Sequence, residues 1–134
     1  MTAAIDIDGL SGEEWLALPP EEFDALVSVG PVLFRVGTAE VLAELRVAPD
    51  GATIILGHID GGGEGVLLRL WVLARALCHQ RGWSRLEWVV HAATCARPNR
   101  KLQRMLALKG FQVVTLDEHG KVYHLVDHPQ GTRT

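Results

Sequence analysis

The stretch that decides the fold is HIDGGGEGVLLRLW, which runs from His58 to Trp71. A β-like run ends at Asp60, four glycines follow within five residues, and an apolar helical pattern begins directly after them. A glycine-rich turn that opens a helix leaves unpaired amide N–H groups, which attract anions and phosphates above all. The plainer interpretation is a tight turn without a chemical role, so the loop predicts a phosphate site only together with other evidence.

The segments around this loop predict one mixed α+β domain. Apolar residues at helical spacing cover residues 65–81, and Gly82 closes that helix. A strand that follows a helical crossover normally lies parallel to the strand before it, so we expect one parallel pair around the loop. The expected strands are 32–36, 40–47, 52–59, 85–92, 111–116 and 121–126, and a further helix is expected over 99–109.

The N-terminal part predicts helices and no strand. Ser11 and Glu14 form a capping box, and a second short helix is expected over 21–28. We therefore divide the single domain, 1–134, into a short helical segment (1–30), a core (32–126) and a loose polar tail (127–134). The turn at 49–51 is attributed to a glycine, Gly51, that accepts positive φ. Trp71 and Trp88 are assigned to the core, whereas Trp15 and Trp83 are left as candidate surface contacts.

The bulk composition excludes several classes of protein. The chain has 134 residues, 48% of them hydrophobic and 22% charged, with a net charge of −3, which argues against nucleic acid as a partner. No apolar run approaches the roughly 20 residues that span a bilayer, and no signal peptide is evident, so we expect a cytoplasmic protein. Cys78 and Cys95 make no disulfide framework, and the His and Cys spacing matches no metal site.

A second motif gives the loop its context. NRKLQRMLALKGF, from Asn99 to Phe111, resembles the segment that closes the cofactor half of the GNAT superfamily, the acetyl-CoA-dependent N-acyltransferases. The family's Q/R-x-x-G-x-G/A loop falls on residues 60–65, and 17 positions separate Gly65 from Gly82, a spacing typical of the family. The resemblance covers residues 32–126. The positions that match the closing segment are Asn99, Leu102, Met105, Leu106, Gly110 and Phe111.

The resemblance implies a fold and a cosubstrate. The fold would be a GNAT-like mixed central sheet, mostly antiparallel with one parallel pair around the glycine loop and with helices on both faces. Acetyl-CoA or another acyl-CoA would bind where the parallel strands splay apart, with no metal. A local basic cluster (Arg97, Arg100, Lys101 and Arg104) would face a phosphate or form a solvated helix face. The implied cofactor-binding residues are Ile59, Gly61, Gly62, Gly63, Glu64, Gly65, Val66 and Asn99.

The catalytic residues depart from the family pattern. The place of the tyrosine that many members use to protonate the leaving thiolate holds Leu106, and the loop begins with Asp60 instead of glutamine or arginine. His91 and His58, near the ends of the two parallel strands, are the candidate catalytic bases, because an imidazole has an ordinary pKa near 6.5. Glu87 would orient His91 or be solvated, and Tyr123 is a candidate replacement acid.

Two functions from different classes follow. The first is an N-acyltransferase that passes an acetyl group from acetyl-CoA to an amine by direct attack. The alternative is a catalytically inactive GNAT-like scaffold, a structural or interaction protein such as one of phage or mobile-element origin. Modification of DNA or RNA is disfavoured by the net charge of −3. The C-terminal hairpin strands offer an edge through which two copies could pair as a homodimer.

Overall fold

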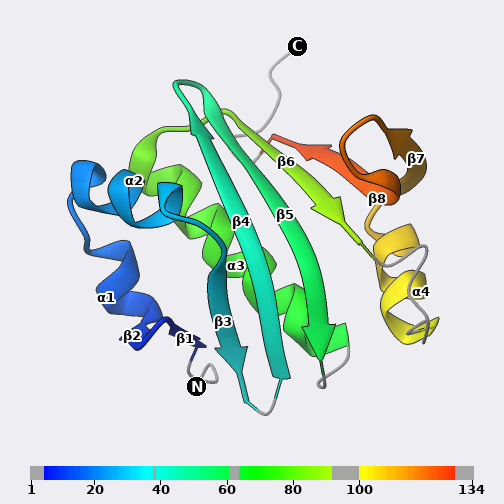
Figure 1. Ribbon diagram of the computed structural model, residues 1–134, viewed down its shortest axis with the longest axis horizontal. Coiled ribbons are helices and arrows are strands. Elements are labelled where there is room, and N and C mark those ends of the chain that lie inside the picture. Colours follow the sequence, from blue (N-terminus) through cyan, green and yellow to red (C-terminus); the bar gives the residue numbers. More distant parts are fainter. Residues whose placement is uncertain (1–4, 38, 61–63, 92–99, 129–134) are drawn as a thin grey trace.

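The computed structural model describes residues 5–37, 39–60, 64–91 and 100–128. These residues form eight strands and four helices, with one long central helix, α3 (Figure 1). In chain order they are β1 (Ile5–Ile7), β2 (Leu10–Ser11), α1 (Gly12–Leu16), α2 (Pro20–Ser28), β3 (Val32–Val36), β4 (Ala39–Ala48), β5 (Gly51–Asp60), α3 (Glu64–Arg81), β6 (Arg85–Val90), α4 (Arg100–Leu108), β7 (Gln112–Leu116) and β8 (Gly120–Asp127).

All eight strands belong to one sheet in the order β2-β1-β3-β4-β5-β6-β8-β7. The pair β5–β6 is parallel, and each of the other pairs is antiparallel. The helix α3 connects the two parallel strands and lies behind the sheet in Figure 1. The predicted mixed sheet with one parallel pair around the glycine loop is therefore confirmed.

The helix boundaries follow the expected capping residues. Ser11 and Glu14 form the predicted capping box at the start of α1. Gly82 (φ 70°) and Gly110 (φ 99°) follow the ends of α3 and α4 in the left-handed conformation that glycine adopts without a Cβ penalty. No helix in the described part of the chain is both long enough and apolar enough to cross a membrane.

The N-terminal strands correct one expectation. The sequence predicted no strand ahead of the helices, whereas β1 pairs with β2 and with β3 and so extends the sheet. Asp8 (φ 52°) and Gly9 (φ 92°) both have positive φ, the backbone signature of a type I′ hairpin turn. The missed signal is therefore the Asp-Gly pair between the short alternating run at Ile5–Ile7 and Leu10.

The main core lies on one face of the sheet. Buried side chains from all four helices join a single cluster with the strands, among them Trp15 of α1, Phe23 of α2, Leu67 of α3 and Leu106 of α4. The other face carries a second, small cluster: Ile55, Val89 and Val122, with Val114 and Leu116 packed against it. Among the described residues this cluster contains strand residues alone, which come from β5, β6 and the β7–β8 hairpin.

The tryptophans extend this core further than the sequence suggested. Trp71 and Trp88 are buried and stack with ring centroids 5.2 Å apart, as expected for core residues. Trp15 and Trp83, predicted as candidate surface contacts, are also buried, at 2% and 3% exposure. Arg81 contributes to the burial of Trp83, because its guanidinium lies over the indole ring, 4.8 Å from the ring centroid.

The C-terminal end of the last strand is tied to α3. Arg75 donates two hydrogen bonds to the carboxylate of Asp127, at 3.1 and 3.0 Å. Only 12% of the Asp127 side chain is exposed. Asp127 is thus part of β8, and the loose tail that the sequence predicted from this residue onward does not begin there.

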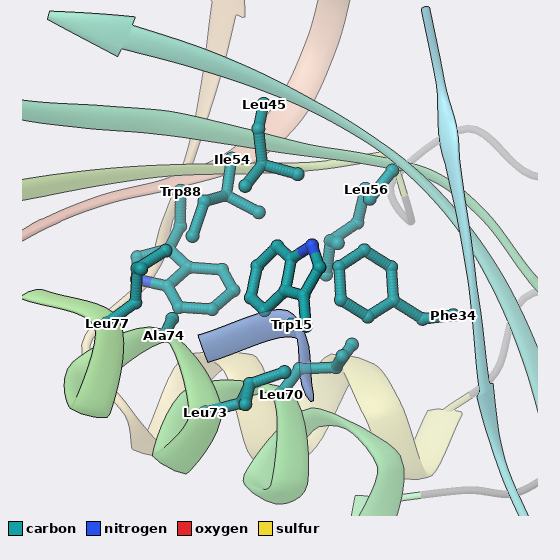
Figure 2. A pocket seen from close by; sticks show the side chains of 11 residues that line it. Trp15, Phe34, Leu45, Ile54, Leu56, Leu70, Leu73, Ala74, Leu77 and Trp88 are labelled. Atoms are coloured by element: carbon teal, nitrogen blue, oxygen red, sulfur yellow. The ribbon is translucent and has the colours of Figure 1, made fainter. Parts of the chain in front are cut away.

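A small cavity remains inside the main core. It has a volume of about 20 Å³ and lies between α3 and the sheet, where Trp15 packs beside Phe34 and Trp88 lies across from Leu77 (Figure 2). A cavity of this size holds about one water molecule. Its lining is almost entirely apolar, so it is a packing void and not a binding site for a cofactor.

Candidate functional site

The parallel pair is closed at one end and open at the other. Six residues of each strand pair in register, from Gly51 with Arg85 to Leu56 with Val90. The N–H of His91 then donates to the carbonyl of Leu56 at 3.0 Å. Residues 57–60 of β5 continue beside β4 but pair with no described residue of β6, and the two strands diverge in Figure 1. Among the described residues, the backbone groups on this side of residues 57–60 have no strand partner.

A β-bulge marks the point where the strands separate. On β4 the neighbours Ala43 and Leu42 pair with Leu56 and His58 of β5, which leaves Gly57 as the extra residue. A bulge bends its strand and increases the local twist. Gly57 is exposed. The bulge lies directly after the last β5–β6 pair, where the two strands begin to diverge (Figure 1).

The loop that the resemblance assigned to the cofactor follows this opening. β5 ends at Asp60 and α3 begins at Glu64, as the strand–loop–helix prediction required. Ile59 is in the last part of β5, Glu64 and Gly65 begin α3, and Val66 is buried in the core. Gly61, Gly62, Gly63 and Asn99 lie outside the described residues, as does Arg97 of the basic cluster.

His91 is placed at the opening. It directly follows β6 and is half-buried, with its ring 5.1 Å from that of His119 at an interplanar angle of 71°. Burial, and secondly the charge of His119, lower the pKa of His91 below its usual value. His58 is in β5 beyond the last β5–β6 pair, and its side chain lies outside the described residues.

Glu87 has partners that the sequence did not predict. One of its carboxylate oxygens lies 2.7 Å from His124 Nε2, and the other accepts a hydrogen bond from Thr53 Oγ1 at 3.1 Å. These bonds, that of His124 foremost, lower the pKa of Glu87. His91 follows Glu87 by four positions, which at about 3.3 Å per residue of extended chain is about 13 Å. The suggestion that Glu87 orients His91 directly is therefore wrong.

Leu106 and the candidate acid Tyr123 differ in burial. Leu106, which stands where the family has its tyrosine, is 0% exposed and belongs to the main core. Tyr123 is half-buried on β8 and pairs with Val90, the residue before His91. The side chain of Tyr123 packs against the main core, and of these two residues only Tyr123 carries a hydroxyl group.

The β7–β8 hairpin contributes a site residue that the sequence did not single out. Val122, Val114 and Leu116 fold over the far face of the sheet, and Glu118 reaches Arg46 on β4 at 3.7 Å. This fold brings His119, in the hairpin loop, against His91. The loop DEHG predicted a hairpin, but no sequence signal shows that a hairpin bends back across its own sheet.

The described residues support neither a cysteine nucleophile nor a metal site. Cys78 is fully buried, and burial raises the pKa of its thiol to about 11, which suppresses the reactive thiolate. Cys95 lies outside the described residues. Within the part of the chain that the structure describes, no three His, Cys, Asp or Glu side chains come together as a metal site.

Comparisons with known proteins bear on the fold. The sequence matches no protein-family model and no curated protein. The structure is similar to the crystal structure of Ard1 from Thermoplasma volcanium, with a TM-score of 0.50 over 93% of this chain and 97% of that chain. Ard1 is an N-acetyltransferase of the GNAT type.

The fold is GNAT-like. The two chains are 13% identical, so the similarity concerns the backbone arrangement and not the residues of a site. The GNAT-like order of elements and the opening of the parallel pair agree with what the two sequence motifs implied.

Proposed function

We propose that this chain binds acetyl-CoA or another acyl-CoA at the open end of the β5–β6 pair and transfers the acyl group to an amine. The observation that carries this proposal is the opening itself, in a GNAT-like fold. β5 continues past its last β6 partner, and the 18-residue helix α3 begins four residues after β5 ends. An acyl-CoA would therefore meet, in succession, a strand edge with which no described residue of β6 pairs and a helix N-terminus.

The groups at the opening suit such a ligand. The backbone N–H and C=O groups of residues 57–60 can bond to the amide groups of a pantetheine arm. Gly57 adds no side chain there, and even a Cβ would meet nothing closer than the Leu42 carbonyl oxygen, at 3.7 Å. The N-terminus of α3 provides amide N–H groups and a dipole that favour a diphosphate. Asn99 and the glycines at 61–63 are proposed contacts from the sequence motifs.

The reaction needs a group that accepts a proton from the amine. His91 is our proposed base, because its lowered pKa leaves the imidazole neutral at pH 7 and able to accept. His58 is the second candidate. A bound thioester supplies the activated acyl group, and its thiol leaves with a proton. Leu106 cannot provide that proton, so we propose the hydroxyl of Tyr123 as the donor.

One observation favours a second function, that of an inactive scaffold. Leu106 is fully enclosed by the core, so its place can hold no proton donor without repacking. A chain that kept the fold and lost the acid would serve as a structural or interaction protein. Acyl-CoA binding and acyl transfer separate this alternative from the enzyme.

We expect isothermal titration calorimetry to detect saturable binding of acetyl-CoA. Gly63→Glu adds a carboxylate at the loop assigned to the diphosphate and should weaken binding at least about tenfold, or about 1.4 kcal/mol. Val72→Glu is the matched control, because it places the same charge on an exposed position of α3, 63% accessible, eight residues from the helix start. If the wild type and Val72→Glu bind acetyl-CoA and Gly63→Glu does not, the result supports a functional acyl-CoA site. If the wild type shows no heat of binding at millimolar acetyl-CoA, the result would contradict the proposal and favour the inactive scaffold.

A further inference from the structure

We propose that His119, in the β7–β8 hairpin loop, is a positioning residue that fixes the orientation of the His91 imidazole and opposes its protonation. The inference rests on the proposed function, in which His91 is the base, and it deepens that function by adding the hairpin to the site. His119 follows His91 by 28 positions in the sequence, and only the fold brings them together.

The contact between the two rings fixes the orientation of His91. Their centroids are 5.1 Å apart and their planes are inclined by 71°, an edge-to-face arrangement. Aromatic rings prefer this geometry because the positive edge of one ring faces the negative face of the other. The main chain of His91 is fixed as well, through its bond to Leu56. Together these contacts restrict both the backbone and the ring of the proposed base.

The hairpin loop that carries His119 is itself held in place. The His119 N–H donates to the carbonyl of Leu116 at 3.1 Å, which closes the turn. The neighbouring Glu118 reaches Arg46 of β4 at 3.7 Å. Leu116 packs on the cluster formed by Ile55, Val89 and Val122. Because these contacts lie on both sides of the loop, His119 remains against His91 without support from a ligand.

A neighbouring imidazole also opposes protonation of His91. When His119 carries a proton, a second positive charge about 5 Å away is unfavourable, and burial of His91 adds to the penalty. Three described carboxylates on the elements around the pair have cationic or hydrogen-bonding partners of their own. Glu118 and Glu44 face Arg46, and Glu87 is bonded to His124 and Thr53. The exposed charges of the hairpin, Asp117 and Lys121, point into solvent and are screened.

The test is an NMR pH titration of the histidine Cε1–H resonances in the free protein. His119→Phe preserves a ring against His91 and removes the two ring nitrogen atoms of His119. We expect the pKa of His91 to rise in this variant, while it stays below the usual value because burial, the larger cause, remains. His79→Phe, on the exposed end of α3, is the matched control and should leave the titration of His91 unchanged. His119→Gln should raise the pKa of His91 in the same way and, in addition, broaden the His91 ring resonances, because it removes the ring contact.

Failure of this inference can be distinguished from failure of the proposed function, because the titration needs neither acyl-CoA nor an acceptor. An unchanged His91 titration in both His119 variants, with the β8 amide resonances preserved, would overturn the inference even in an active enzyme. An equal shift in His79→Phe would overturn it too. In an active enzyme, the acidic limb of the kcat/KM profile should move upward with His91 in His119→Phe. A shifted titration without acetyl-CoA binding would instead refute the proposed function and leave the coupling of the two rings intact.

Discussion

Replacing Gly51 by alanine is expected to lower the free energy of unfolding by about 3 kcal/mol or more, as in severe overpacking of a core. A Cβ built on Gly51 would lie 1.9 Å from the carbonyl oxygen of Arg85 and 2.8 Å from its carbonyl carbon. Both atoms belong to the backbone, so no side-chain rotation can relieve the overlap. One of the two parallel strands would have to move, against the hydrogen bonds that Ser84 and Arg85 donate to the Asp50 carbonyl.

The measurement is urea unfolding of the wild type and the variant, compared at equal m-value. Gly57→Ala is the control in the same strand, since a Cβ there makes an ordinary contact at 3.7 Å. We expect its midpoint to stay close to that of the wild type. If Gly51→Ala and Gly57→Ala unfold at the same denaturant concentration, the close approach at Gly51 is not a constraint on the fold.

The glycine at this position also shows what the sequence could not predict. The PDG turn suggested that Gly51 is needed for positive φ, yet its φ is not in that region, and the requirement is the approach of Arg85 from a strand 34 residues away. Close packing between distant segments leaves no local pattern. The same holds for His119, whose contact with His91 depends on how far the β7–β8 hairpin bends.

Features with a local physical cause were predicted well. The apolar residues at helical spacing predicted α3. The glycines predicted where α3 and α4 end, because Gly82 and Gly110 adopt positive φ within one or two residues of the last turn. The parallel β5–β6 pair was predicted because a helix connects the two strands, and parallel strands need such a crossover. The first strand, β1, was missed because it has three residues, too few for alternation to be distinguished from chance.

The close approach of β5 and β6 at one end and their divergence at the other both depend on glycines of β5. At Gly51 the strands approach too closely for a side chain, and six residues later the bulge at Gly57 turns β5 away. The bonds of the closed end fix the position from which the strands diverge. The main chain of His91, our proposed base, is held at this divergence by its hydrogen bond to the Leu56 carbonyl.

In a preparation that acylates an amine, His91→Gln is expected to reduce kcat/KM by about 10²- to 10⁴-fold, the usual contribution of a positioned general base. This loss corresponds to about 3–5 kcal/mol of transition-state stabilisation. Glutamine is close to histidine in size and can still hydrogen bond, but it cannot accept the proton of the attacking amine. Steady-state kinetics with acetyl-CoA and a saturating acceptor measure the loss, and the KM for acetyl-CoA should change little, because His91 acts on the amine.

The pH dependence separates a base from a structural histidine. A base must be neutral, so kcat/KM of the wild type should fall as the pH drops through the pKa of His91, which lies below its usual value, and should level off above it. His91→Gln should lose this acidic limb, whereas His79→Gln, exposed on α3, should keep both the rate and the limb. If His91→Gln retains the wild-type rate and profile, another group accepts the proton, and His58, on the opposite strand of the opening, is the residue to replace next.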